Sequence, residues 1–156
     1  RTWSTRPRNS WRRQRNMGIN ARFFIKRLLK RNEEVQQGVR DITKNMVAAM
    51  MDELVPATPI RTGRARRNWQ VTMGEHDVVE WAPRTPPERN AEVALENARR
   101  RIDAYHDLSK PLGVRNPIPY LTRLNEGYSA QAPAGFIQDA ILRARSVVNK
   151  GFRFRP

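Results

Sequence analysis

The feature that most constrains the fold is a series of apolar side chains, spaced for one long helix, between Asn32 and Pro56. These positions recur in steps of three and four, which places them on one helical face. They are Val35, Val39, Ile42, Met46, Ala49, Met50 and Leu54. At 1.5 Å per residue such a helix is about 33 Å long. Burial of its apolar face predicts one core along the helix, with Ile42 and Met46 at the centre.

Local signals define both ends of this predicted helix. Asn32 is a favourable N-cap, because its side chain accepts hydrogen bonds from amides that have no partner in the first turn. Glu33 and Glu34 suit the positive end of the helix dipole. Pro56 cannot continue the backbone hydrogen bonds and marks the end.

After a turn at Thr62 and Gly63, alternating apolar and polar residues between Arg67 and Ala82 predict a β-hairpin. Side chains at every second position lie on one face of a strand, so the alternation is typical of a half-buried sheet. The apolar members are Trp69, Val71, Met73, Val79 and Trp81. The turn of the hairpin is predicted at residues 74–77.

Two further segments follow the predicted hairpin. Residues 90–105 predict a helix, with an ion pair between Glu96 and Arg100 on one face. Residues 112–119 predict an extended segment that can add a third strand only at an edge of the sheet, because its two prolines cannot donate ladder hydrogen bonds.

Residues 116–136 predict a short helix over 120–125, which Gly127 ends in a left-handed conformation. A second helix follows, with Pro133 near its first turn. Its apolar positions are Phe136, Ile137, Ala140, Ile141, Ala144 and Val148. The predicted fold class is therefore α+β, with a long amphipathic helix packed on a small antiparallel sheet, additional shorter helices and an extended basic N-terminal arm.

Every charged side chain from residue 1 to residue 31 is positive. Up to Asn16 this stretch has no apolar period, which predicts an extended arm that orders only against a partner. Residues 20–30 predict a short basic amphipathic helix. The predicted organisation is the arm and short helix over 1–31, a single α+β domain over 32–150 and a tail over 151–156. The tail alternates aromatic and basic residues, which fits either a short strand on another chain's sheet edge or a disordered tail.

Composition narrows the class of partner and the chemistry. The 156 residues suit one domain, and the formal net charge of +15 indicates an anionic partner, either nucleic acid, an acidic protein surface or anionic lipid. The absence of cysteine excludes disulfides and thiolate nucleophiles, and it fits a protein assembled in a reducing cytoplasm. No apolar run is long enough for a membrane span. Because the chain opens with Arg1, we expect that its natural N-terminus was trimmed, processed or left out.

The sequence offers no catalytic constellation. His76 and His106 are far apart, and no serine lies in a nucleophile elbow. No glycine-rich phosphate loop with a following lysine occurs. We therefore predict no enzyme activity, no catalytic residue, no metal site and no cofactor.

The order of residues in two segments is more specific than that of a generic loop. The first contains Pro119-Tyr120, then Leu124-Asn125-x-Gly127, then Gln131-Ala132-Pro133-x-Gly135-Phe136. The second is residues 59–71, which begin Pro-Ile-Arg-Thr-Gly. Together these segments closely resemble the tail-completion, or neck, family of minor tail components in long-tailed bacteriophages. The resemblance covers about residues 35–148, although relatives often carry an acidic residue where Arg61 stands and are loopier over residues 88–107.

This resemblance implies a structural virion protein that joins the head-completion proteins to the tail, as part of a ring around the DNA channel. The implied partners are copies of itself, neighbouring head-completion or adaptor proteins, and tail-terminator or tail-tube proteins. The implied location is the head-tail junction of the virion, after assembly in the host cytoplasm. The implied interface residues are Tyr120, Leu124, Asn125, Gly127, Gln131, Ala132, Pro133 and Phe136. Packing within the domain is an equal alternative for Leu124 and Phe136, and a weaker one for Gln131.

A second interpretation is a nucleic-acid-binding protein that acts through its arginine-rich arm, with Trp3 and Trp11 available for base stacking. The arginines are Arg1, Arg6, Arg8, Arg12, Arg13 and Arg15. DNA must pass through a virion neck, which argues against tight binding there and favours an arm that docks on acidic neighbours, with only non-specific DNA contact. Membrane attachment through Phe23, Phe24, Leu28 and Leu29 is less favoured, because the apolar stripe is short and marginal anchoring needs a second signal.

Overall fold

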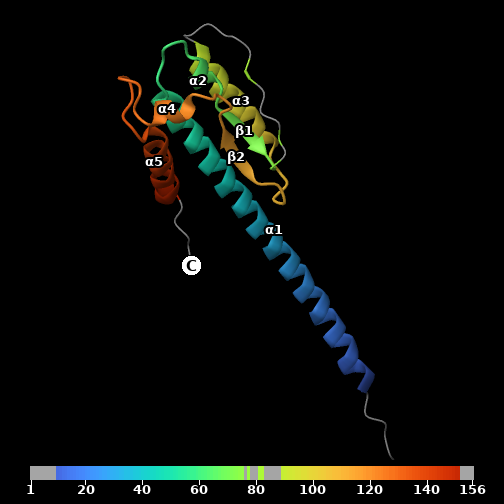
Figure 1. The fold of residues 1–156 in the computed structure, drawn as a ribbon. Coiled ribbons are helices and arrows are strands. Elements are labelled where there is room, and N and C mark those ends of the chain that lie inside the picture. The colour runs from blue at the N-terminus through green and yellow to red at the C-terminus, as the bar shows by residue number, and fades with distance from the viewer. Residues whose placement is uncertain (1–9, 76, 78–80, 83–88, 152–156) are drawn as a thin grey trace, which may run out of the picture. The chain divides into compact units, whose positions relative to one another are not determined.

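A computed structural model describes residues 10–75, 77, 81–82 and 89–151 (Figure 1). It is a mixed, helix-rich fold with a small two-stranded antiparallel sheet. The elements are α1 (Ser10–Ala57), α2 (Arg64–Arg67), β1 (Gln70–Met73), α3 (Asn90–Ala104), β2 (Leu112–Arg115), α4 (Leu121–Asn125) and α5 (Phe136–Gly151). Internal contacts divide the chain into a first unit of residues 1–38 and a second unit of residues 39–156.

Helix α1 begins much earlier than the sequence analysis predicted. It runs without interruption from Ser10 to Ala57, so Asn32 lies inside a helix and is not its N-cap. The prediction of an extended arm is wrong from residue 10 onward, and residues 1–9 lie outside the described part. Arginine, lysine, glutamine, leucine and alanine all have high helix propensity, and that preference does not require an apolar period. Pro56 lies in the last turn, close to the predicted end.

The core lies on a face of α1 that overlaps the predicted face only in part, because Leu54 belongs to both while Ile42 and Met46 are not at its centre. Val47, Met51, Leu54 and Val55 are buried, whereas Ile42 and Met46 are only partly buried and Val35 is 56% exposed. Six consecutive apolar residues, Met46 to Met51, allow two helical faces, and the spacing alone did not select between them. The side chains that complete this core are Trp69, Val71, Ala94, Ala98, Ile102 and Ala140.

Among the described residues the sheet pairs β1 with β2, and most of the return strand of the predicted hairpin, residues 78–80, lies outside them. The pairing is antiparallel, and Val71 lies opposite Val114. At the end of β1 the Met73 amide donates to Asp77 Oδ2 at 2.7 Å, while the Gly74 amide donates to the Pro111 carbonyl at 2.7 Å and continues the contact with the segment of β2 by one residue. Trp81 belongs to no strand, and Val79 lies outside the described residues. The extended segment predicted over 112–119 supplies β2.

The two larger helices after β1 form where the sequence predicts them, although Ile141 of the predicted apolar face of α5 is 39% exposed. Helix α3 buries Asn90, Ala94, Ala98 and Ile102, packs on β1 and carries the predicted Glu96–Arg100 ion pair. Helix α5 buries side chains at steps of four, and Arg143 Nε lies 2.8 Å from Glu53 Oε2 on α1. The buried side chains of α5 are Phe136, Ala140, Ala144 and Val148. The small alanines allow α5 to approach its neighbours closely, and the predicted tail strand over 152–156 lies outside the described residues.

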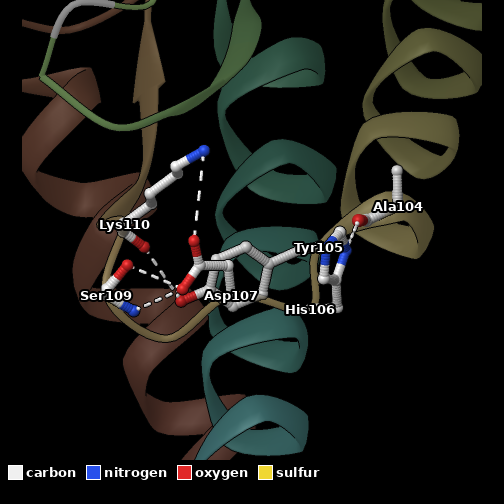
Figure 2. Close-up of polar contacts among 6 residues, drawn as sticks. All are labelled: Ala104, Tyr105, His106, Asp107, Ser109 and Lys110. Atoms are coloured by element: carbon white, nitrogen blue, oxygen red, sulfur yellow. Dashed lines mark hydrogen bonds and ion pairs between the residues drawn. The ribbon is translucent and has the colours of Figure 1, made fainter.

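A hydrogen-bonded turn connects α3 to β2 (Figure 2). Asp107 Oδ1 accepts hydrogen bonds from the Ser109 hydroxyl at 2.7 Å and from the Ser109 amide at 3.0 Å. The Tyr105 hydroxyl donates to the Lys110 carbonyl at 3.1 Å and closes the turn. The Ser109 hydrogen bonds hold the pKa of the Asp107 carboxyl below its ordinary value. Because the folded-state pKa is the lower one, this turn stabilises the fold above the unfolded-state pKa and loses that contribution as the pH falls through the folded-state pKa.

The burial pattern predicts opposite outcomes for two identical substitutions. Leu54 is 1% exposed and Leu142 on α5 is 60% exposed. Leu54→Ala leaves a cavity, and we expect the free energy of unfolding to fall by about 2–5 kcal/mol. Leu142→Ala removes little buried area, and we expect a change within about 0.5 kcal/mol. Urea denaturation of both variants measures the difference, and equal losses would contradict the assignment of the core.

Candidate interaction site

The two segments that carry the sequence resemblance contact each other in the structure. The Ile60 amide donates to Gln131 Oε1 at 2.7 Å, across 71 residues of sequence. A second link joins Asn116 Nδ2 to the Ala65 carbonyl at 2.8 Å. Residues 59–71 and 116–136 therefore form one region of the second unit, although neither segment alone indicates this.

Gly127 ends α4 in the conformation that the sequence predicts. Its φ is +90°, in the left-handed region that favours glycine. The Gly127 amide donates to the Leu124 carbonyl and the Tyr128 amide donates to the Arg123 carbonyl, both at 3.3 Å. This pair of bonds is a Schellman motif, which satisfies carbonyls that the end of a helix leaves without partners. The cap turns the chain toward the 128–135 segment.

Asn125 connects α4 to the start of α5. Its carbonyl accepts from the Gly135 amide at 2.7 Å, and its Oδ1 accepts from the Ile137 amide at 3.0 Å. Its Nδ2 donates to Gln138 Oε1 at 2.9 Å. The first amides of a helix have no intrahelical acceptor, so Asn125 supplies one from the preceding helix. The side chain of Asn125 therefore acts within the domain.

The eight predicted interface residues divide into two groups. Phe136 and Ala132 are buried, and Asn125 and Gly127 hold the backbone of the domain. For Phe136, the alternative that it packs within the domain's own core therefore agrees with the structure. The remaining four reach the surface to some extent: Tyr120, Gln131 and Pro133 are exposed, and Leu124 is partly buried. Of these, Tyr120, Leu124 and Gln131 line a common pocket.

This pocket, which we call the two-segment pocket, has a volume of about 660 Å³ and is lined by both segments. Sequence reasoning missed three of its prominent side chains, Arg61, Arg64 and Tyr128. Tyr128 is 79% exposed. Its place directly after the Gly127 cap is the sequence feature from which it could have been predicted as a surface residue. The lining residues are Pro59, Arg61, Thr62, Gly63, Arg64, Ala65, Tyr120, Leu124, Tyr128, Ser129, Ala130 and Gln131.

The basic residues near the pocket differ in their surroundings. Arg66 donates to the Pro56 and Thr58 carbonyls at 2.8 and 2.9 Å, and burial lowers the pKa of its guanidinium. Arg67 is buried, and the Arg64 guanidinium stacks 3.8 Å from the ring centre of Trp81. Arg61 is exposed at the pocket. Since the lining residues include two arginines and no acid, the pocket favours a segment that carries carboxylate or carbonyl groups.

The other predicted functional positions lie elsewhere. Arg12, Arg13 and Arg15 are in α1, and Arg1, Arg6 and Arg8 lie outside the described residues. His106 Nδ1 lies 2.8 Å from the Ala104 carbonyl, while His76 is outside the described part. Within the described residues, no group of three or more His, Cys, Asp or Glu side chains converges on a point that could hold a metal ion. In the same part of the chain, no helix combines the length and apolar character needed to cross a bilayer.

Comparison of the chain with protein families, with curated proteins and with solved structures finds no match.

Replacing glycine by alanine should lower the stability of the fold at Gly127 and raise it at a glycine inside a helix. A Cβ at Gly127 would lie 3.2 Å from Ala134 Cβ on a backbone with positive φ, so we expect Gly127→Ala to cost about 1–2 kcal/mol. Gly38 lies inside α1 and a Cβ there meets nothing within 4 Å. Gly38→Ala should therefore add about 0.5–1 kcal/mol. Thermal melts of both variants test the pair, and a gain at Gly127 would contradict the cap.

Proposed function

We propose that this protein is a structural component of a bacteriophage neck that joins head-completion proteins to the tail. The observation that carries the proposal is the meeting of the two family-like segments at one surface pocket, through the 2.7 Å bond between Ile60 and Gln131. Their meeting across 71 residues of sequence gives the two segments one surface through which a shared role can act. The sequence resemblance supplies the rest of the proposal.

In this proposal the two-segment pocket receives an extended segment of a neighbouring protein in the ring. Tyr120 and Tyr128 present large, rigid contact area at low entropic cost, as aromatic residues do at interfaces. Arg61, at a position where relatives often carry an acid, pairs with a carboxylate of this chain's own neighbour, so the charge at this position matches the neighbour and not the family pattern. The Gly127 cap and the Asn125 hydrogen bonds keep the pocket wall in one conformation, so that little ordering is needed on binding.

Particle assembly tests this function directly. A double variant, Arg61→Glu with Tyr128→Ser, changes two exposed side chains of the pocket and leaves the buried core intact. We expect it to melt like the wild type, yet to yield separate heads and tails when it replaces the natural chain, because reversed charge and lost aromatic area remove the contact. Leu142→Ser, also exposed but outside the pocket, is the matched control and should give joined particles. Normal joining by the double variant, or absence of the wild-type chain from purified particles, would contradict the proposal.

The net charge of +15 favours one further candidate function, non-specific DNA binding through the basic N-terminal residues. If the six arginines between Arg1 and Arg15 all met phosphates, counterion release would give a slope of roughly −5 in log affinity against log salt. We expect a shallower slope and weak affinity, because these arginines dock on an acidic neighbouring subunit instead.

The measurement is a salt series of DNA affinity for the wild type and for a variant with all six arginines changed to serine. A second readout is the amount of the variant recovered in particles. A steep wild-type slope that the variant abolishes, with normal incorporation, would replace docking by DNA binding.

A further inference from the structure

The amino half of α1 carries large apolar side chains that remain exposed among the described residues of the first unit. Within the first unit, six large apolar side chains on the helix are between 53 and 63% exposed, and all of them except Phe23 lie on one face. We call the apolar residues on this face, together with Asn32, the α1 seam: Phe24, Ile25, Leu28, Leu29, Asn32 and Val35. Contiguous apolar patches of this kind on a protein surface mark sites of association.

The spacing of the seam is that of a coiled coil. If Ile25 is an a position of a heptad, Leu28 is d, Asn32 is a and Val35 is d. In sequence the same register continues through Val39, Ile42, Met46 and Ala49. A repeat of 3.5 residues keeps one stripe facing one partner helix. The amphipathic helix of an ordinary globular domain needs a broader face, whereas this stripe fits a second helix with the same repeat.

The charges of this part of α1 lie outside the seam. In the heptad register Lys26, Arg27, Lys30, Glu33 and Glu34 take the b, c and f positions, which point away from a partner. Lys30 Nζ and Glu34 Oε1 lie 4.0 Å apart along the helix itself. Only Arg22 and Arg31, at e and g, flank the seam between residues 22 and 35. A helix pairing with its own copy therefore avoids most like-charge contacts at close range.

From these observations we propose that α1 pairs with α1 of a second copy of this chain, in parallel and in register through the seam. In that arrangement each g residue faces the e residue five positions on in the second copy. Phe24 then meets Leu29 of the second copy, and Arg31 meets the neutral Gln36. Asn32 faces Asn32, and the two side chains hydrogen-bond to each other. A single polar a position fixes register and orientation, since any other alignment buries the amide against apolar side chains.

The evidence for this pairing comes from α1 alone. The pairing joins copies two at a time, so it is separate from the head-to-tail contacts of a ring and does not depend on a place in a virion. It also differs from docking on an acidic partner or on anionic lipid in its response to salt. Two copies bring many positive charges together, so added salt screens repulsion and tightens the pair. Binding to an anionic surface weakens under the same change.

The chain has no cysteine, so single cysteines report the geometry without background. Leu28→Cys places a thiol at a d position, and we expect mild oxidation to give disulfide-linked dimers. Lys30→Cys, at an f position two residues away, is the matched control and should stay monomeric after denaturation. Both side chains are exposed in the single chain, so neither change threatens the core. Dimers in solution that Leu28→Cys fails to cross-link would overturn the parallel register.

Sedimentation of the full chain tests the pairing itself. We expect a dimer that tightens from low to moderate salt, and a dissociation constant raised about a hundredfold by Leu28→Glu with Val35→Glu, taking tenfold for each seam position. Lys30→Glu makes the same kind of charge change outside the seam and should leave the pair intact or tighter. A monomer at every accessible concentration would overturn the proposal, as would a monomer that binds vesicles of mixed zwitterionic and anionic phospholipid. Either result would leave the neck function to be judged by its particle test.

Discussion

The hydrogen bonds at the carboxyl end of α1 are the interaction on which the second unit depends. The last carbonyls of a helix have no partners within it, and here side chains of the following segment supply them. Trp69 Nε1 donates to Thr58 Oγ1 at 2.7 Å, Thr58 Oγ1 donates to the Leu54 carbonyl at 2.7 Å, and Arg66 reaches the Pro56 and Thr58 carbonyls. Thr58 is fully buried, so an unmade bond there would leave a polar group without water. These contacts fix where β1 starts, and β1 in turn positions β2, α4 and the pocket.

Polar groups that are satisfied within the domain also distinguish the residues that build the interaction site from the residues that face a partner. Asn125, Gly127 and Gln131 use their polar groups or their backbone on other parts of the same domain. A sequence motif can thus be specific without being a contact surface, because a specific order of residues is needed to satisfy a closely folded loop. The side chains left for a partner are those around these supports, chiefly Tyr120, Tyr128 and Arg61.

The parts of the fold that the sequence predicted are those governed by local chemistry. The Gly127 cap, the short α4, the alanine face of α5 and the Glu96–Arg100 pair each follow from residues within one or two turns of each other. The pairing of β1 with β2 was not predicted, because β2 lies about forty residues further along the chain and the alternation within β1 says nothing of so distant a partner. The pocket could not be predicted either, since it requires Ile60 and Gln131 to meet in space.

The sequence predicted an extended basic arm, but α1 is helical from Ser10 onward, and this difference changes how the basic side chains can meet a partner. An extended arm would spread its arginines freely along an anionic partner and order only on contact. On a helix the same charges are held at fixed angles, so from residue 22 to residue 35 they lie mainly on the b, c and f positions and leave an apolar stripe between them. A surface with this division can hold an apolar partner on one side and an anionic one on the other. Self-pairing through the seam and docking through the arginines are therefore compatible, and the second would gain from the first, because a paired helix presents two sets of charges to one acidic surface.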